Sequence, residues 1–251
     1  MSNNVIVIFP STYRSIQLEQ TTSTNSYASN YILKHKIDQV HVFHTNVQTE
    51  GKARNGKSWS SYPHKNLLFS LVANFNLPLS KRFYISKAVA LGVKDYLDSL
   101  SVQEVKIKWP NDILVRNEKI AGILIENSIA GDRIQNAVIG VGLNVNQSKF
   151  PEFERKATSL FTVTELILDF KEVLEDAVQS ILHRLNQLNA LDTIDQDYHN
   201  ALYGRGRGMR FEHKGRMFSA FIEKVDTDGL LWLKSAAGTF AYDLNSLVFI
   251  D

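Results

Sequence analysis

The sequence predicts an α+β protein, in which a mixed β-sheet has helices packed on one side and a small β-barrel follows. Apolar runs of strand length and helical patterns occur together along residues 1–203, which is typical of an α+β domain. Residues 209–251 change character and form short alternating runs broken by turn sequences. The 251 residues leave room for both parts, so we expect a main domain over 1–203 and a small barrel domain over 204–251.

Composition narrows the class of protein. A hydrophobic fraction of 44% and a charged fraction of 22% are globular values. The net charge of +2 does not indicate a general nucleic-acid or membrane binder. The absence of cysteine removes disulfides, thiol nucleophiles and cysteine-ligated zinc. The seven histidines have no metal-ligand spacing, so the sequence identifies no metal site with certainty.

The beginning of the chain carries no recognisable targeting signal. Met1–Asn4 lacks the basic region of a signal peptide, and the apolar run Val5–Phe9 is too short for one. No apolar run approaches the length of a membrane span. We therefore expect a cytoplasmic protein.

The first hundred residues alternate short strands with two helices. Ser23 begins a helix-capping sequence, and the helix is expected to continue over Tyr27–Lys34. Polar residues and glycines over 45–61 predict a long loop. Apolar residues at helical spacing predict a second helix over Lys81–Leu100. The strands expected in this part are Val5–Phe9, Ile16–Glu19, Val40–His44 and Asn66–Asn74.

Strands dominate the middle of the chain. Apolar residues alternate with lysines over Val105–Trp109, which predicts a half-buried strand. The polar segment Arg116–Lys119 predicts a hairpin turn between strands at Ile113–Val115 and Ile120–Ile125. A further strand is expected over Ile134–Val145, where it ends in a glycine-rich sequence.

Helices are expected between this sheet and the barrel. After a connector at Phe150–Leu160, Thr162 and Glu165 resemble a capping box. A long amphipathic helix should follow to about Leu188, and a shorter helix should cover Asp192–Tyr203.

The junction Gly204–Gly208 is expected to be a hinge or turn; an RGG-type RNA contact is the weaker alternative. The five strands of the barrel should be separated by turns that include His213–Gly215, Asp226–Gly229 and Ala237–Gly238.

Polar groups surround a sharp break between two apolar runs at Lys108–Asp112, and Lys119 follows seven residues later. An apolar strand gains nothing from such groups unless a ligand or a metal uses them. Lysines neutralise phosphate oxygens. Asn111 and Asp112 can hold Mg²⁺ or orient a nucleophile. The pattern suits a reaction on a nucleoside triphosphate.

The loop Gln48–Trp59 places three cations and two glycines in nine residues. Glycines let backbone N–H groups approach an anion, and cations add charge. The alternative is a solvated turn. Gly51 to Ser58 also fits the letters of a Walker phosphate loop, but the residues from Trp59 onward cannot continue a helix well. A Walker loop is therefore not favoured.

Five segments in this order resemble the biotin protein ligases over about residues 20–145. They are Ser23-Thr24-Asn25, Gln48–Trp59, Lys108–Asp112, Lys119–Glu126 and Gly140–Asn144. The family's loop usually reads Gly-Arg-Gly-Arg-x-Gly-Arg-x-Trp. Here Lys52 and Lys57 replace arginines, and Ala53 replaces a glycine.

The resemblance implies a fold and a domain content. The main domain would have the fold of class II synthetases and biotin–lipoyl ligases, and the C-terminal barrel would be SH3-like. Some members of this family carry an N-terminal DNA-binding domain of about 60 residues. Only 22 residues precede Ser23, so we expect a short form without that domain.

The resemblance also assigns site residues. Lys119 would bridge the biotin carboxylate and the α-phosphate, Arg54 would hold the phosphate of the intermediate, and Asp112 would accept or orient a proton of the acceptor lysine. The residues assigned to biotin are Ser23, Thr24, Asn25, Gln48, Gly51, Lys52, Lys119, Gly122 and Gly140. The residues assigned to ATP are Arg54, Trp59, Lys108, Asn111 and Asn144.

The activity that the resemblance implies is an ATP-dependent ligase reaction. The enzyme would activate biotin as biotinyl-5′-AMP and transfer it to a lysine of a biotin carboxyl carrier protein. ATP, biotin and Mg²⁺ would take part, with Mg²⁺ bound mainly through the ATP phosphates. No DNA or membrane partner is expected, and a homodimer through an edge strand is left open.

Two other functions stay open. The first is a lipoate or octanoate attachment enzyme of the same superfamily. Such enzymes commonly carry an Arg-Arg…Gly-Gly-Gly pattern, which this sequence lacks. The second is a biotin-binding protein without catalytic activity, which would show no ATP turnover.

Structural interpretations compete at several of these positions. The Ser23–Asn25 segment could serve only as a helix cap. Trp109 alternates with Lys108, so we expect a core aromatic there. The remaining alternatives are a core aromatic at Trp59, a turn residue at Asp112 and a strand bulge at Gly140 and Gly142.

Overall fold

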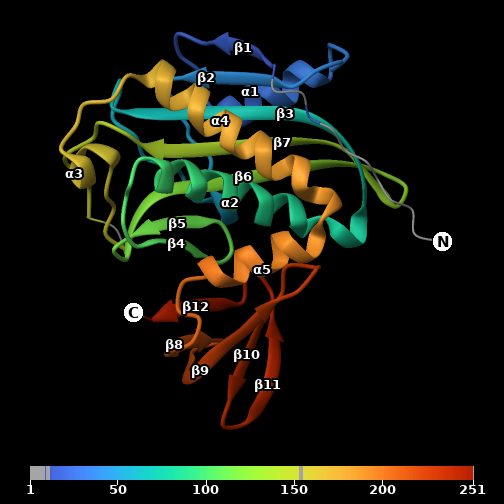
Figure 1. The fold of residues 1–251 in the computed structure, drawn as a ribbon, viewed down its shortest axis with the longest axis vertical. Coiled ribbons are helices and arrows are strands. Elements are labelled where there is room, and N and C mark those ends of the chain that lie inside the picture. The colour runs from blue at the N-terminus through green and yellow to red at the C-terminus, as the bar shows by residue number, and fades with distance from the viewer. Residues whose placement is uncertain (1–8, 10–11, 153–154, 251) are drawn as a thin grey trace.

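The computed structural model describes residues 9, 12–152 and 155–250. Within them the main sheet has seven strands in the order β1-β2-β3-β7-β6-β5-β4 (Figure 1). Its strands are β1 (Arg14–Gln17), β2 (His41–Thr45), β3 (Asn66–Pro78), β4 (Val105–Lys108), β5 (Asp112–Val115), β6 (Glu118–Ala130) and β7 (Arg133–Asn144). β1 and β2 are parallel and the other neighbours antiparallel, so the mixed sheet of the prediction is confirmed. Apart from Phe9, the strand expected at Val5–Phe9 lies outside the described residues.

The long helices cover one face of this sheet, as predicted, and a short helix lies on the other. Figure 1 shows α2 and α4 across the front of the strands and α1 behind them. The helices are α1 (Thr24–Ile32), α2 (Phe83–Ser99), α3 (Leu160–Thr164), α4 (Phe170–Asn186) and α5 (Leu191–Ala201). Short 3-10 turns lie at Arg54–Gly56, Leu79–Lys81 and Gln187–Asn189.

Side chains of β3 point alternately to the two faces of the sheet, and both faces are packed by helices. Leu67, Phe69 and Leu71 are buried in the large cluster with the long helices. Val72 belongs instead to a small cluster with Ala28 of α1. Successive side chains of a strand point to opposite faces, so a nearly continuous apolar run serves two layers. The central strands are thus fixed from both sides.

The predicted capping box at Thr162 and Glu165 is wrong. Ser159 caps α3 instead, because its hydroxyl accepts a hydrogen bond from the Thr162 N–H at 3.1 Å. Glu165 ends that short helix in the left-handed region, with φ of 61°. The long helix α4 starts only after Asp169, whose carboxylate accepts hydrogen bonds from two N–H groups of the first turn.

A second sheet occupies the C-terminal part and lies below α5 in Figure 1. Its five antiparallel strands, counted over the described residues, have the order β11-β10-β9-β8-β12 and are consistent with the expected SH3-like barrel. They are β8 (Gly208–His213), β9 (Arg216–Val225), β10 (Leu231–Ser235), β11 (Gly238–Tyr242) and β12 (Leu247–Ile250). Gly204 and Gly206 before it have φ of 79°, as a turn requires. The domain boundary between residues 203 and 204 stays a prediction.

Buried polar groups join the two sheets. The Nζ of Lys87 on α2 is fully buried, lies 2.5 Å from a carboxylate oxygen of Asp195 and donates to the Val225 carbonyl at 2.8 Å. The Val225 N–H donates to Nε2 of His199 at 2.8 Å. Trp109 is buried, as expected for a core aromatic, and its indole N–H donates to the Gly229 carbonyl at 2.9 Å. These bonds fix the C-terminal sheet against α2 and α5.

Among the described residues, none of the helices combines the length and the apolar character that crossing a membrane requires.

We predict that His199 makes the stability of the fold depend on pH. Its Nε2 must be unprotonated to accept the Val225 N–H, and burial lowers the pKa of His199, with Asp195 opposing and Lys87 and Arg205 adding to that shift. The unfolded chain therefore binds the proton more readily, so stability falls as the pH drops below about 6.5. The loss is at most about 1.4 kcal/mol per pH unit for one group.

The test compares denaturant unfolding at pH 7.5 and pH 5.5 in the wild type and in His199→Gln. Glutamine can still accept the hydrogen bond but does not titrate. The wild type should lose more stability on acidification than the variant. An equal loss in both proteins would contradict the role of His199.

Candidate functional site

The candidate site lies on the sheet face that carries α1, over a strip of glycines on β6 and β7. Gly140 pairs with Ser70 on β3 and with Leu124 on β6. A Cβ built on Gly140 would lie 2.1 Å from the Oδ1 of Asn25. The Asn25 amide thus occupies the space that a side chain at this position would need.

Asn25 is held there by three partners on two strands, β3 and β6. Its Nδ2 donates to the Glu126 carboxylate at 2.7 Å and to the Leu124 carbonyl at 3.2 Å. The Ser70 hydroxyl donates to its Oδ1 at 2.6 Å. Asn25 and Ser70 are buried. The beginning of α1 is therefore fixed to the middle of the sheet.

The next row of the strip accommodates Trp59. Gly142 pairs with Leu68 on β3 and with Gly122 on β6. Cβ atoms on Gly142 and Gly122 would lie 2.5 Å and 2.7 Å from the indole ring. The Nζ of Lys119 lies 5.3 Å from the ring centroid, a cation–π distance. The indole N–H is buried, and no described residue accepts its hydrogen bond.

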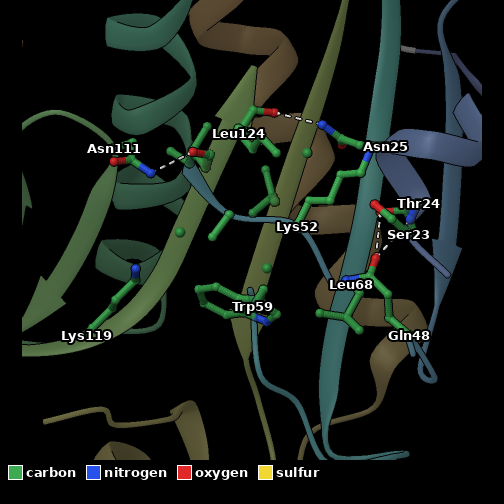
Figure 2. A pocket seen from close by; sticks show the side chains of 16 residues that line it. Ser23, Thr24, Asn25, Gln48, Lys52, Trp59, Leu68, Asn111, Lys119 and Leu124 are labelled. Atoms are coloured by element: carbon green, nitrogen blue, oxygen red, sulfur yellow. Dashed lines mark hydrogen bonds between the residues drawn. The ribbon is translucent and has the colours of Figure 1, made fainter. Parts of the chain in front are cut away.

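The first turn of α1 presents polar groups beside this strip (Figure 2). Ser23 caps the helix, because its hydroxyl accepts from the Ser26 N–H at 3.5 Å. The predicted cap is therefore confirmed. The Oε1 of Gln48 accepts from the Thr24 N–H at 2.9 Å, and the hydroxyl groups of Thr24 and Ser70 lie 2.8 Å apart.

The loop before Trp59 is closed by its own backbone. The Trp59 N–H donates to the Gly51 carbonyl at 2.8 Å, and Lys52 and Ser58 form an antiparallel bridge. No helix follows Ser58, so the Walker interpretation is wrong. Ala53 has φ of −126°, an extended conformation that any residue adopts, and its replacement of a glycine introduces no strain.

Arg54 links this loop to the C-terminal sheet. Its guanidinium donates to the side-chain oxygen of Asn245 at 3.5 Å. Burial lowers the pKa of Arg54, and the nearby Asp112 carboxylate opposes that shift. An arginine stays charged after such a shift. Arg54 thus brings a positive charge to the meeting point of the loop and the two sheets.

In the central segment, Asp112 contacts Lys119, whereas Asn111 and Lys108 have other partners. The Nζ of Lys119 lies 2.6 Å from a carboxylate oxygen of Asp112. Asn111 is tied to β6 twice, since its Nδ2 donates to the Ile123 carbonyl at 2.9 Å and its own carbonyl accepts the Ile123 N–H at 3.0 Å. The Nζ of Lys108 lies 4.5 Å from the ring centroid of Phe249.

Asn144 is buried and supports the site from behind. Its Nδ2 donates to the Thr158 carbonyl at 2.9 Å and to the Lys119 carbonyl at 3.4 Å. The Lys119 backbone is also paired with Lys156 and Thr158. Asn144 therefore fixes the strand from which Lys119 projects.

Two cavities meet at this point. The smaller has a volume of about 40 Å³ and contains all nine residues assigned to biotin except Gly51 in its wall. The larger, of about 550 Å³, contains Arg54, Lys108, Asp112 and Asn144 in its wall. Ala53, Trp59, Asn111 and Lys119 line both.

Trp59 limits the smaller cavity. Small-molecule sites usually have a volume of about 300 Å³ or more. The smaller cavity, with about 40 Å³, is well below that size. The indole covers Gly122, which the resemblance assigned to biotin, and Gly142, which had no such assignment. Trp59 therefore fills space next to the smaller cavity. The assignment of Trp59 to adenine stays a prediction.

Sequence reasoning missed Ser70 and Glu126. A serine within the apolar run of β3 resembles a tolerated core residue, and its partner Asn25 is 45 residues away. Glu126 ended a recognised segment but had no assigned role. The bulge alternative at Gly140 and Gly142 is wrong, because the pairing of β7 is regular across both glycines.

We predict that alanine at the two paired glycines has unequal effects on stability. Gly140→Ala should cost about 1–3 kcal/mol, as overpacking does, because the Asn25 amide is held by three partners. Gly142→Ala should cost less, because it displaces Trp59 on a loop. Denaturant unfolding of both variants measures this difference. A larger loss for Gly142→Ala would contradict it.

Comparison with known proteins finds relatives of this chain. The model of the biotin/lipoate A/B protein ligase family matches residues 17–144. The bifunctional ligase/repressor BirA of Bacillus spizizenii is 29% identical over 196 residues, which are 76% of this chain and 60% of that protein. The chain thus spans less than two thirds of that relative. The biotin–[acetyl-CoA-carboxylase] ligase of Mycobacterium tuberculosis is 29% identical over 81% of this chain and 76% of its own length.

Solved structures share the fold. A biotin protein ligase from Aquifex aeolicus, in complex with biotin and ATP, matches with a TM-score of 0.77 and 22% identity over 94% of this chain and 99% of that chain. At this identity the likeness concerns the fold alone. The family model covers just over half of the sequence and both rows of the glycine strip, and the chain belongs to the biotin/lipoate A/B protein ligase family.

Proposed function

We propose that this protein is an ATP-dependent biotin protein ligase. It activates biotin as biotinyl-5′-AMP and transfers the biotinyl group to a lysine of a biotin carboxyl carrier protein. The observation that carries the proposal is the meeting of two cavities at Lys119, since the first reaction must join a carboxylate to a phosphate there. Family membership and the named relatives support it.

In the first step, a carboxylate oxygen of biotin attacks the α-phosphorus of ATP and pyrophosphate leaves. The carboxylate is already ionised at pH 7, so no general base is needed. The step needs alignment and charge neutralisation. Lys119, now paired with Asp112 at 2.6 Å, exchanges that partner for the two anionic ligands. Arg54 adds a second cation from the loop.

In the second step, the acceptor lysine attacks the acyl carbon and AMP leaves. The attacking amine must first lose a proton. Asp112 is the proposed group that accepts or orients that proton, because it lines the larger cavity beside Lys119. When the adenylate engages Lys119, the Asp112 carboxylate is released for this task.

We assign the other predicted site residues either to biotin or to ATP. The biotin head lies against Ser23, Thr24, Asn25 and Gln48, and the proposed site extends along Gly51, Lys52, Gly122 and Gly140. Trp59, Lys108, Asn111 and Asn144 serve ATP, where Asn144 acts by fixing the Lys119 strand.

Mg²⁺ enters the proposal as an ion held mainly by the ATP phosphates. No group of three histidine, aspartate or glutamate side chains in the described ranges could hold it alone. The wall of the larger cavity contains the carboxylates of Asp112 and Glu152, and Asp112, beside Lys119, is the one that would hold the ion. The ion would offset charge on the triphosphate. A homodimer stays a prediction and plays no part in this chemistry.

We expect that biotin stimulates pyrophosphate release from ATP and that lipoate does not. The polar end of the smaller cavity, formed by Thr24 and Gln48, suits a ureido group, whereas a dithiolane ring would leave these groups without partners. A coupled pyrophosphate assay with each acid, followed by mass analysis of the acyl-adenylate, tests this. Equal release with lipoate would favour a lipoate attachment enzyme, and no release with biotin would favour a non-catalytic protein.

A second experiment addresses Lys119. Lys119→Ala should lower the rate of adenylate formation by about 10²–10³, the usual value of a positioned cation at developing charge. Lys106→Ala, at an exposed lysine on β4, which β5 separates from β6, is the matched control and should leave the rate unchanged. A Lys119→Ala protein that is folded and retains more than about a third of the rate would remove Lys119 from the reaction.

A further inference from the structure

A chain of hydrogen bonds links β6 to the polar end of the smaller cavity, and its direction is fixed. The Leu124 carbonyl and the Glu126 carboxylate can only accept hydrogen bonds. Both lie within bonding distance of one end of the Asn25 amide, at 3.2 Å and 2.7 Å. That end must therefore be the NH₂ group. The amide oxygen of Asn25 consequently faces Ser70 on β3.

The next bond follows from the first. An amide oxygen only accepts, so the single hydroxyl hydrogen of Ser70 is directed to Asn25, at 2.6 Å. The Ser70 oxygen also lies 2.8 Å from the Thr24 hydroxyl. Because the Ser70 hydrogen is already engaged, the Thr24 hydroxyl must be the donor in this 2.8 Å contact. The 3.4 Å distance from Thr24 to Gln48 makes the competing bond weaker.

The result is a defined pattern at the cavity. The Thr24 hydroxyl has committed its hydrogen to Ser70, so its oxygen presents lone pairs to a ligand. Gln48 has committed its Oε1 to the Thr24 N–H at 2.9 Å, so its Nε2 is the donor. One acceptor beside one donor complements a group that carries an N–H next to a carbonyl, such as a cyclic urea.

The geometry points to Ser70 as a positioning residue that makes the Thr24 hydroxyl an acceptor and thereby selects ligands that present an N–H at this position. The inference rests on the proposed biotin chemistry and goes beyond it in naming the residue that sets the polarity. Ser70 is fully buried, lies behind Thr24 and Asn25, and is absent from the cavity wall. It acts through Thr24 and does not touch the ligand.

The test uses a ligand in which a hydrogen-bond acceptor replaces the N–H donor that faces Thr24. The probes are biotin and its cyclic carbamate analogues, in which either ureido N–H is replaced by a ring oxygen. Wild-type protein should bind biotin roughly a hundredfold more tightly than the analogue whose oxygen faces Thr24, because an acceptor then meets an acceptor. In Ser70→Ala the Thr24 hydroxyl is free to turn and donate, so this preference should fall to about tenfold.

Calorimetric titration of both probes separates the outcomes. If Ser70→Ala weakens biotin and the analogue by the same factor, Ser70 is only structural and the inference is overturned. If wild-type protein binds no biotin, the proposed function fails, and this inference fails with it. Ser99→Ala removes a serine hydrogen bond at the end of α2, away from both cavities, and should keep the wild-type preference.

Ser70→Cys covers the case in which the alanine variant does not fold. A thiol is close to a hydroxyl in size but is a weak donor and acceptor. The ratio of the two affinities, biotin over the analogue, should then lie between the wild-type value and the lower value expected for Ser70→Ala. A Ser70→Cys protein that binds both probes with the wild-type ratio would overturn the inference.

Discussion

The close approach that glycine allows on β6 and β7 is the constraint on which the site depends. Gly122, Gly140 and Gly142 remove three Cβ atoms from the middle of a sheet that is packed on its other face by long helices. Asn25 fills the space beside Gly140, and Trp59 fills the space beside Gly122 and Gly142. Neighbouring strands are only about 4.8 Å apart, so the polar Asn25 and the aromatic Trp59 lie side by side on one surface of the sheet.

The two spaces serve different physical purposes. The row with Gly140 holds Asn25 permanently, and through Ser70 it determines which way the Thr24 hydroxyl points. The row with Gly142 holds Trp59, whose buried N–H is unsatisfied among the described residues. A buried donor without a partner costs about 1–3 kcal/mol. This cost makes the indole less firmly held in its position than the Asn25 amide, whose polar atoms all have partners.

Local patterns predicted most of the fold, since period-2 and period-3.6 hydrophobicity places the central strands and α2 within a few residues. The capping box at Thr162 failed because Ser159, three residues earlier, is the actual cap and only a short helix follows it. The site was harder to predict. Lys119 and Asp112 stand out in an apolar run, whereas Ser70 does not, because its role arises from a contact with Asn25 that only the folded sheet creates.

The loop Gln48–Trp59 has two lysines and one arginine, and the planar guanidinium group of the arginine contacts Asn245. Lys52 and Lys57 are exposed, so a compact ammonium on a flexible stem supplies the charge that these positions offer. Arg54 is half-buried and reaches Asn245 in the turn between β11 and β12. A guanidinium has five donors in a rigid plane, so it can bond Asn245 and keep further donors for the phosphate that we propose it binds. Of these three positions, the arginine stands at the one whose side chain reaches a second part of the molecule.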